Sequence, residues 1–249
     1  MTQSLRTTIR RTIRAIRKYI RRRRPLRGSN LFSDLNSNLP HLVVRTVFDV
    51  GANVGDVSRS FVKHYQKCSI YAFEPIPSVY SILCDNVKHL DNVRCFNVAL
   101  SDTAGRMSMR RQGHDGLYTL EESEVIGEVG DEVQGIQVTT IDEFCSDHDI
   151  QEIDYLKIDA GGHDAKVLAG CKQMLSNQAI SIIEVEAGMN PDDQIFSTLE
   201  EMKLFLESFD YRVFALYEQM HEFKTKSPHL RRVNAVFISR NLIRQHTPE

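Results

Sequence analysis

Residues 49–55 have the sequence Asp-Val-Gly-Ala-Asn-Val-Gly and lie between a β-branched run and a helical pattern over residues 56–65. Glycines at a strand-to-helix junction let the backbone turn tightly and approach a ligand closely, and the start of the helix offers free N–H groups. The next strand-like run, Ser69–Phe73, ends at Glu74, 23 residues after Gly51. An acid there can accept hydrogen bonds from the ribose hydroxyls of a nucleoside. The stretch therefore predicts a nucleoside site on an α/β fold.

The glycine spacing in this turn argues against a dinucleotide. A dinucleotide-binding turn has the pattern Gly-x-Gly-x-x-Gly. Here Gly51 and Gly55 are four residues apart, with Asn53 between them, and the third glycine is absent. Asp49 places a carboxylate inside the motif, which disfavours a pyrophosphate and suits a cationic or zwitterionic ligand. An NAD-dependent dehydrogenase is therefore the weaker hypothesis.

Strand-like and helix-like patterns alternate from residue 41 onward, which is typical of a parallel sheet flanked by helices. Residues 112–156 carry 13 acids and no Lys or Arg, and several glycines interrupt them, so we expect a surface excursion around one short strand. The expected strands are Val43–Val50, Ser69–Phe73, Val93–Leu100, Ile136–Thr139, Ile153–Ile158, Ile180–Val185, Tyr211–Leu216 and Val233–Ser239.

The net charge of −2 conceals two parts of opposite charge. Residues 6–27 contain 11 basic and no acidic residues, which leaves 20 basic against 33 acidic residues elsewhere, a formal charge of −13. In this basic arm Ile9, Ile13, Ile16 and Ile20 would form one narrow stripe on a helix. An apolar stripe within a basic face is typical of a helix that lies on anionic lipid.

Three other interpretations of the arm stay open: a helix docked on the acidic body of the protein, a nucleic-acid arm and an organelle transit peptide. We favour the anionic membrane surface, and nucleic acid is a disfavoured partner. We do not expect a signal peptide, because the arm lacks a continuous apolar core.

Composition and cysteine content bound the class of protein. Hydrophobic residues make up 41% of the chain and charged residues 26%, which excludes collagen-like, low-complexity and mainly disordered chains. No apolar run approaches the roughly 18 residues of a membrane span. Five cysteines without zinc or redox spacing predict reduced thiols and a cytoplasmic protein, peripheral on the inner membrane face. We expect a basic amphipathic arm at 1–27, a polar linker at 28–40 and one domain at 41–249.

Several short motifs follow one another between residues 43 and 240. They are the turn at 49–55, Phe73-Glu74-Pro75, residues 97–102 with Gly105, residues 138–142, residues 153–159, Gly162-His163, Val167-Leu168, Gly170, and Glu186 with Gly188. In this order and spacing they resemble the FkbM-type S-adenosylmethionine-dependent methyltransferases. The resemblance implies a class I methyltransferase, Rossmann-like α/β fold with a seven-stranded, mostly parallel sheet whose last strand, Val233–Ser239, is antiparallel.

The same resemblance implies S-adenosylmethionine as the cofactor. In that fold the glycine turn holds the methionine part, with the acid at its start near the amino group. The acid after the second strand holds the ribose, and the segment after the third strand borders the adenine. The implied cofactor-binding residues are Asp49, Gly51, Asn53, Gly55, Glu74, Ala99, Ser101 and Asp102.

The end of the expected strand Ile153–Ile158 departs from the family pattern. The family usually follows Asp159 with Val-Glu-Gly-His-Glu, whereas residues 160–164 are Ala-Gly-Gly-His-Asp, so the acid expected at Gly161 is missing. An alcohol is a poor nucleophile until its proton is removed or a cation lowers its pKa. We expect His163 to take this proton near neutral pH, and Asp159 to orient it or to accept the proton itself.

Asp159 and Glu186 are the candidate ligands for a divalent cation. Glu184 and Glu186 lie two residues apart on one expected strand and so share a face, where a buried pair of acids needs a cation or a shared proton. Two carboxylates make an incomplete metal site, so a metal is disfavoured. The resemblance predicts an O-methyltransferase acting on a hydroxyl of a sugar, glycan or glycolipid. The alternative is a non-catalytic module that binds the cofactor but has lost the chemistry with the acid at Gly161.

Overall fold

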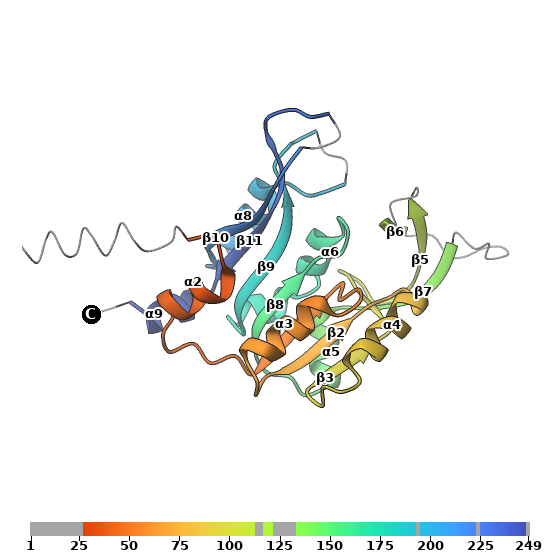
Figure 1. Cartoon of the computed structure of the whole chain (residues 1–249), viewed down its shortest axis with the longest axis horizontal. Coiled ribbons are helices and arrows are strands. Elements are labelled where there is room, and N and C mark those ends of the chain that lie inside the picture. The colour runs from red at the N-terminus through yellow and green to blue at the C-terminus, as the bar shows by residue number, and fades with distance from the viewer. Residues whose placement is uncertain (1–26, 113–116, 122–132, 193–194, 223–224, 248–249) are drawn as a thin grey trace, which may run out of the picture.

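A seven-stranded sheet forms the centre of the molecule, a computed structural model that describes residues 27–112, 117–121, 133–192, 195–222 and 225–247 (Figure 1). The strand order is β10-β11-β9-β8-β1-β2-β3. Strand β11 runs antiparallel to both of its neighbours, and the other neighbouring strands are parallel. The predicted mostly parallel sheet with an antiparallel last strand is confirmed. The strands are β1 Thr46–Val50, β2 Ser69–Phe73, β3 Val93–Phe96, β8 Ile153–Ile158, β9 Ile180–Gly188, β10 Arg212–His221 and β11 Leu230–Ile238.

Helices cover both faces of this sheet and bury its apolar side chains. One cluster joins Phe61 of α3 and Leu242 of α9 to Tyr155 of the sheet, and another joins Phe144 of α5 and Leu206 of α8 to the opposite face. The result is three layers. The helices are α3 Asp56–His64, α4 Pro77–Val87, α5 Ile141–Asp147, α6 Asp164–Ala169, α7 Lys172–Ser176, α8 Leu199–Ser208 and α9 Arg240–Gln245.

A small second sheet of order β4-β7-β5-β6 lies beside α4, at one side of the main sheet (Figure 1). The single strand expected over Val93–Leu100 is wrong, because the chain divides there between β3 in one sheet and β4 in the other. Asn97 holds the turn between them, since its Nδ2 donates to the carbonyl oxygens of Glu74 (2.9 Å) and Pro75 (3.0 Å). The excursion expected over 112–156 contains two strands of this sheet. Its strands are β4 Ala99–Leu100, β5 Gly105–Gln112, β6 Leu117–Glu121 and β7 Val133–Thr139.

The segment expected as a polar linker at 28–40 instead contains helix α2, Leu31–Asn38. The Asn30 side chain caps the helix by accepting from the Ser33 N–H at 2.9 Å. Leu35 is fully buried in the core, and the tyrosine hydroxyl of Tyr217 on β10 donates to the Asp34 carboxylate at 3.0 Å. Polar composition alone suggested a linker, but one buried leucine and one buried acid attach this segment to the body. Residues 1–26 of the basic arm lie outside the described residues.

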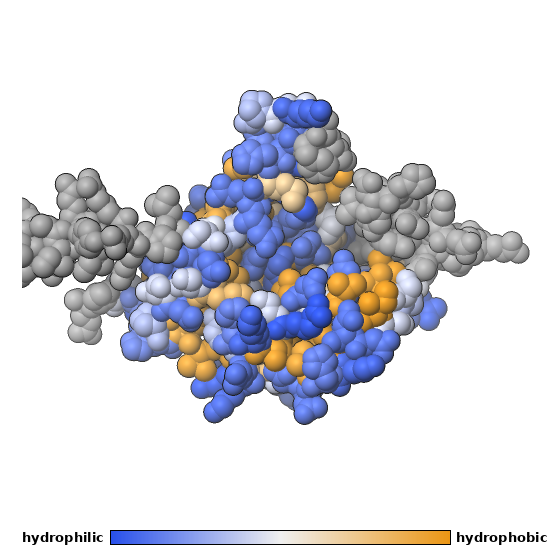
Figure 2. Space-filling view, in the orientation of Figure 1, coloured by the Kyte–Doolittle hydropathy of each residue, from blue (hydrophilic) through white to orange (hydrophobic). Residues whose placement is uncertain are grey.

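The surface shown in Figure 2 is mostly hydrophilic. The exposed large apolar side chains lie before β1 (Val43), on α4 (Ile82), on α8 (Leu204) and on β10 (Val213 and Met220). Within the described ranges, every helix is too short or too polar to cross a membrane.

Candidate active site

The glycine turn after β1 passes unusually close to the end of β8. Gly51 has φ +77°, and a Cβ placed on it would lie 1.9 Å from the carbonyl oxygen of Asp159. Gly55, which begins α3 with φ +89°, would place a Cβ 2.9 Å from a methyl group of Leu83. Asn53 between them also has a positive φ of 50°. Glycine is therefore required at Gly51 because two parallel strands deliver their carboxyl ends to the same place.

The carboxylate of Glu74 is held rigidly at the end of β2. Its Oε2 accepts from the Asn53 N–H and its Oε1 accepts from the Ile76 N–H, both at 3.0 Å. The residue is 5% exposed, and burial raises the pKa of its carboxyl. Each carboxylate oxygen has a second lone pair, so the group can accept two further hydrogen bonds from a ligand.

A cavity of about 320 Å³ opens between these elements, beyond the carboxyl ends of β1, β2 and β8. This volume lies at the lower end of the range for small-molecule sites, roughly 300–1,000 Å³. The polar residues of its wall are Asn53, Asp56, Glu74 and Asp159, and its apolar residues include Ile76, Val98, Ala99 and Leu100. Gly51 and Gly161 also line it.

Asp49 lies on β1 but does not belong to the described cavity wall. It is 1% exposed, and the Ser58 hydroxyl of α3 donates to its Oδ2 at 2.6 Å. Burial raises the pKa of Asp49 to about 6, although the Ser58 hydrogen bond and the charge of Lys157 lower it. The carboxylate is therefore a charge buried behind the glycine turn.

The three residues predicted beside the adenine separate in the structure. Ala99 lines the cavity, whereas Ser101 and Asp102 are not among the lining residues. Ser101 is fully buried, and its Oγ lies 2.8 Å from Nε2 of His163 and 3.0 Å from Oδ1 of Asp102. The structure thus connects this segment to the predicted catalytic histidine.

The predicted catalytic residues lie on the segment that leaves β8. The Asp159 side chain is 47% exposed, lines the cavity, and pairs with Nζ of Lys157 at 3.3 Å. His163 precedes α6 and is half-buried. Between them Gly161 has φ +61°, a left-handed conformation that favours glycine. The segment therefore brings one carboxylate to the cavity and one imidazole beside it.

Comparison with known proteins gives a family for this arrangement. The family described as the methyltransferase FkbM domain matches residues 49–213, from the glycine turn into β10. The chain belongs to the FkbM methyltransferase family. This confirms the family that the motifs predicted.

Three curated relatives of this FkbM-family chain are similar at low identity. The 2-O-methyltransferase NoeI of Sinorhizobium fredii is 27% identical, and the match covers 52% of this chain and 58% of the relative. The hexuronic acid methyltransferase AglP of Haloferax volcanii is also 27% identical, with 65% of this chain and 64% of the relative covered. The 31-O-demethyl-FK506 methyltransferase FkbM of Streptomyces tacrolimicus is 29% identical, with 50% of this chain and 58% of the relative covered. The matches thus span about three fifths of each relative's length.

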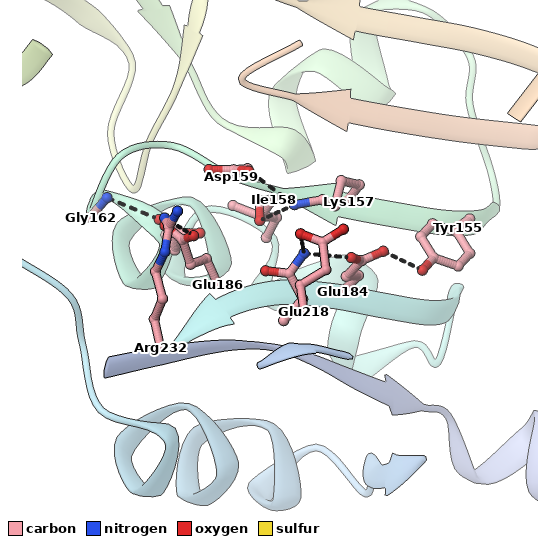
Figure 3. A network of polar contacts seen from close by, with 11 residues as sticks. Tyr155, Lys157, Ile158, Asp159, Gly162, Glu184, Glu186, Glu218 and Arg232 are labelled. Carbon is pink, nitrogen blue, oxygen red and sulfur yellow. Dashed lines mark hydrogen bonds and ion pairs between the residues drawn. The ribbon is translucent and has the colours of Figure 1, made fainter. Parts of the chain in front are cut away.

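Side-chain cations neutralise the pair of acids on β9 of the FkbM domain. Glu184 and Glu186 are each 5% exposed. Glu184 accepts from the Tyr155 hydroxyl at 2.5 Å and from Asn234 at 3.0 Å, and its strand register places it beside Lys157 (Figure 3). Glu186 forms an ion pair with Arg232. The cation that such acids need is therefore present as lysine and arginine.

Lys157 occupies the centre of this network. It is 4% exposed, and the register of β1, β8 and β9 sets it between Asp49 and Glu184 in one row across the sheet. Burial lowers the pKa of Lys157, but the charges of Glu184, Asp159 and Asp49 outweigh this and raise it above the usual range. The lysine is therefore a permanent buried cation.

The proposed metal ligands are both engaged by these cations, Asp159 by Lys157 and Glu186 by Arg232. Within the described ranges, no three His, Cys, Asp or Glu side chains come together in a way that could hold a metal ion. Burial and the charge of Asp159 raise the pKa of Glu186 to about 7, despite the opposing effect of Arg232.

Sequence reasoning missed the roles of Lys157 and Arg232. A lysine within the apolar strand Ile153–Ile158 was an available signal, because a buried lysine needs acidic partners. Arg232 carried no such signal, since its partner Glu186 is 46 residues away in the chain.

Proposed function

We propose that this chain is an S-adenosylmethionine-dependent O-methyltransferase whose acceptor is a hydroxyl of a sugar, glycan or glycolipid. One observation carries the proposal: the cavity at the carboxyl ends of β1, β2 and β8 contains the fixed carboxylate of Glu74. The names of the relatives NoeI and AglP, a 2-O-methyltransferase and a hexuronic acid methyltransferase, support a sugar hydroxyl.

The residues of the cavity match the chemical parts of this cofactor. Glu74 has free lone pairs for the two ribose hydroxyls, and Ile76, Val98 and Leu100 provide an apolar wall for the adenine. Asp159, a half-exposed residue of the cavity wall, provides a negative charge for the cationic methionine part. When bound, S-adenosylmethionine supplies a methyl group on a positively charged sulfur.

The contribution of the chain is to place and deprotonate the acceptor hydroxyl. His163 would take its proton, because an imidazole can accept a proton near neutral pH. Lys157 pairs with the Asp159 carboxylate at 3.3 Å and so holds this side chain at the cavity wall. The fixed charges need no rearrangement during the reaction, which is how preorganised electrostatics lower a barrier.

Binding of S-adenosylhomocysteine tests the cofactor half of this proposal. Titration calorimetry should show one site per chain in the wild type and roughly 10- to 100-fold weaker binding in Glu74→Gln, since hydrogen bonds to a charged group are lost. Glu200→Gln, on an exposed position of α8, is the matched control and should bind as the wild type does. Absence of heat and of a thermal shift in the wild type would reject the cofactor.

Turnover distinguishes the enzyme from the non-catalytic module. Transfer of a labelled methyl group should be measured on a panel of neutral, acidic and amino sugars and on glycolipids, with His163→Ala as the variant expected to lose activity. Cofactor binding without transfer to any member of the panel would favour the module. The methyl-transfer activity of Gly161→Glu, which restores the residue usual in the family, should then be compared with that of the wild type under the same conditions.

We also propose that the basic arm attaches the protein to the anionic inner face of a membrane. Arg27, where the arm meets the body, donates to the Phe214 carbonyl oxygen (3.3 Å) and to Asn38 Oδ1 (2.6 Å), so the arm leaves from a fixed point on β10. A variant lacking residues 1–26 keeps this anchor. It should no longer sediment with anionic vesicles, and sedimentation equal to that of the full chain would refute the proposal.

A further inference from the structure

A second cavity, of about 390 Å³, is lined by residues of α4, of β3 and of the turn between them, and two of these residues are cysteines. Cys84 comes from α4 and Cys95 from β3. Both side chains are half-buried, whereas the other three cysteines of the chain, Cys68, Cys145 and Cys171, are buried. Cys84 and Cys95 are therefore the two thiols that a reagent in solution can reach.

The fold brings these two thiols together, although they are 11 residues apart in the chain. Tyr80 and Cys84 are separated by one helical turn, so their side chains share a face of α4. The Tyr80 hydroxyl donates to the Cys95 carbonyl oxygen at 3.5 Å, which sets this face against β3. The Cys84 side chain is a hydrogen-bond partner of both the Tyr80 hydroxyl and the Cys95 thiol. The two sulfurs are therefore neighbours in the folded chain.

The surroundings distinguish one thiol from the other. Burial, together with the charge of Cys84 and its hydrogen bond, raises the pKa of Cys95 to about 12. Because the thiolate is the nucleophile in thiol–disulfide exchange, Cys95 reacts poorly with an oxidant at neutral pH, and Cys84 reacts first. Once Cys84 is bonded to another sulfur it carries no charge, so one cause of the raised pKa of Cys95 disappears.

We propose that Cys84 and Cys95 are a redox modification site, which a small disulfide such as oxidised glutathione converts into a disulfide bond between α4 and β3. The Cys84 thiolate attacks one sulfur of the oxidant, forms a mixed disulfide and releases one glutathione. Cys95 then gives its proton to water and attacks the Cys84 sulfur, and the second glutathione leaves. The two cysteines lose two electrons and two protons, and the oxidant takes them up as it is reduced to two glutathione thiols.

The bond would join two elements that build the cofactor cavity. On α4, Asn86 donates from Nδ2 to the Val54 carbonyl oxygen at 2.9 Å, and a Cβ at Gly55 would lie 2.9 Å from a methyl group of Leu83. Strand β3 leads into Val98 of the cavity wall. A sulfur–sulfur bond of about 2.05 Å is shorter than any contact between unbonded sulfurs, so it draws the two elements together beside a turn with no spare room. Oxidation therefore weakens cofactor binding, and this consequence rests on the proposed function.

Peptide mapping of the wild type tests the site without any substitution. The reduced protein is incubated at pH 8 with oxidised glutathione, alkylated in denaturant and digested with trypsin, which cuts after Lys88 and Arg94 between the two cysteines. Peptides 68–88 and 95–106 should stay joined until a reductant is added, and tandem mass spectrometry should place the link at Cys84. Absence of the linked pair at saturating oxidant, or a link through Cys68, would overturn the proposal.

Two serine variants test the order of the steps. In Cys95→Ser the mixed disulfide has no second thiol to resolve it, so Cys84 should keep one bound glutathione until a reductant is added. In Cys84→Ser the remaining Cys95 should gain glutathione at least about 10-fold more slowly. Equal rates in two variants whose circular dichroism matches the wild type would contradict Cys84 as the first nucleophile.

Titration calorimetry with S-adenosylhomocysteine tests the consequence for the cofactor. The oxidised wild type should bind roughly 5-fold more weakly than the reduced protein, or weaker still. Cys84→Ser treated with the same oxidant should bind as the reduced wild type does. Equal affinity of the two redox forms would refute the effect on the cavity. Lack of binding by the reduced protein would instead reject the proposed function, and the peptide map would still decide the disulfide.

Discussion

Asp49→Asn is expected to raise the free energy of unfolding at pH 8, although it removes a charge that attracts Lys157. Burial raises the pKa of Asp49 from 3.8 to about 6, and this value already includes the opposing effects of Ser58 and Lys157. A difference of about two pKa units corresponds to about 3 kcal/mol between the protonated and ionised forms. Asparagine resembles the protonated form, and its side-chain oxygen can still accept from Ser58.

The sign of the effect follows from proton linkage. Because the pKa of Asp49 is higher in the folded state than in the unfolded state, the proton stabilises the fold, and this stabilisation is complete below about pH 4. It is lost as the pH rises to about 6. The two proteins should therefore be equally stable near pH 4, and at pH 8 the variant should be more stable by up to about 3 kcal/mol.

Urea unfolding at a series of pH values between 4 and 8 measures this difference, provided that each transition is two-state. Asp85→Asn, at an acid whose side chain is 80% exposed on α4, is the control and should follow the wild-type curve. Parallel curves for Asp49→Asn and wild type, or a variant that is less stable at pH 8, would refute the argument that ionised Asp49 destabilises the fold. A stabilised variant with weaker cofactor binding would indicate that the charge is retained for function.

Three further substitutions test other parts of the structure. Lys157→Met removes the buried cation that lies near Glu184, Asp159 and Asp49. The free energy of unfolding, measured by heat or urea at pH 7, should fall by about 3–5 kcal/mol. A fall of less than about 1 kcal/mol would contradict the network. Gly51→Ala places a methyl group on the Asp159 carbonyl oxygen, so circular dichroism should show a protein that is unfolded or strongly destabilised. The control Gly105→Ala meets no atom within 4 Å, and its loss of stability should be smaller. Leu35→Ala leaves a cavity at a fully buried position of α2 and should lower the free energy of unfolding by about 2–5 kcal/mol. A decrease of only a few tenths of a kcal/mol would support the interpretation of residues 28–40 as a linker.

The sequence alone predicted the main sheet and that the glycine turn and Glu74 lie together at its edge. The bounds of β2 and β8 agree with the strands expected at Ser69–Phe73 and Ile153–Ile158, because polar residues or turns bound each of these apolar runs. Glu74 and the glycine turn were predicted to share a cavity, and they do, since parallel strands bring their carboxyl ends to one edge. Each of these features is marked by its own local motif, whose residues are only a few positions apart in the chain.

The tertiary structure alone decided which charged groups meet. The register of the sheet sets Lys157 between acids of two other strands, the fold brings Arg232 to Glu186, and the end of β4 brings Ser101 to His163, 62 residues later in the chain. Local composition could indicate that buried acids needed a cation but could not supply its identity. Burial energies depend on neighbours in space, and those neighbours exist only once the strands have been paired.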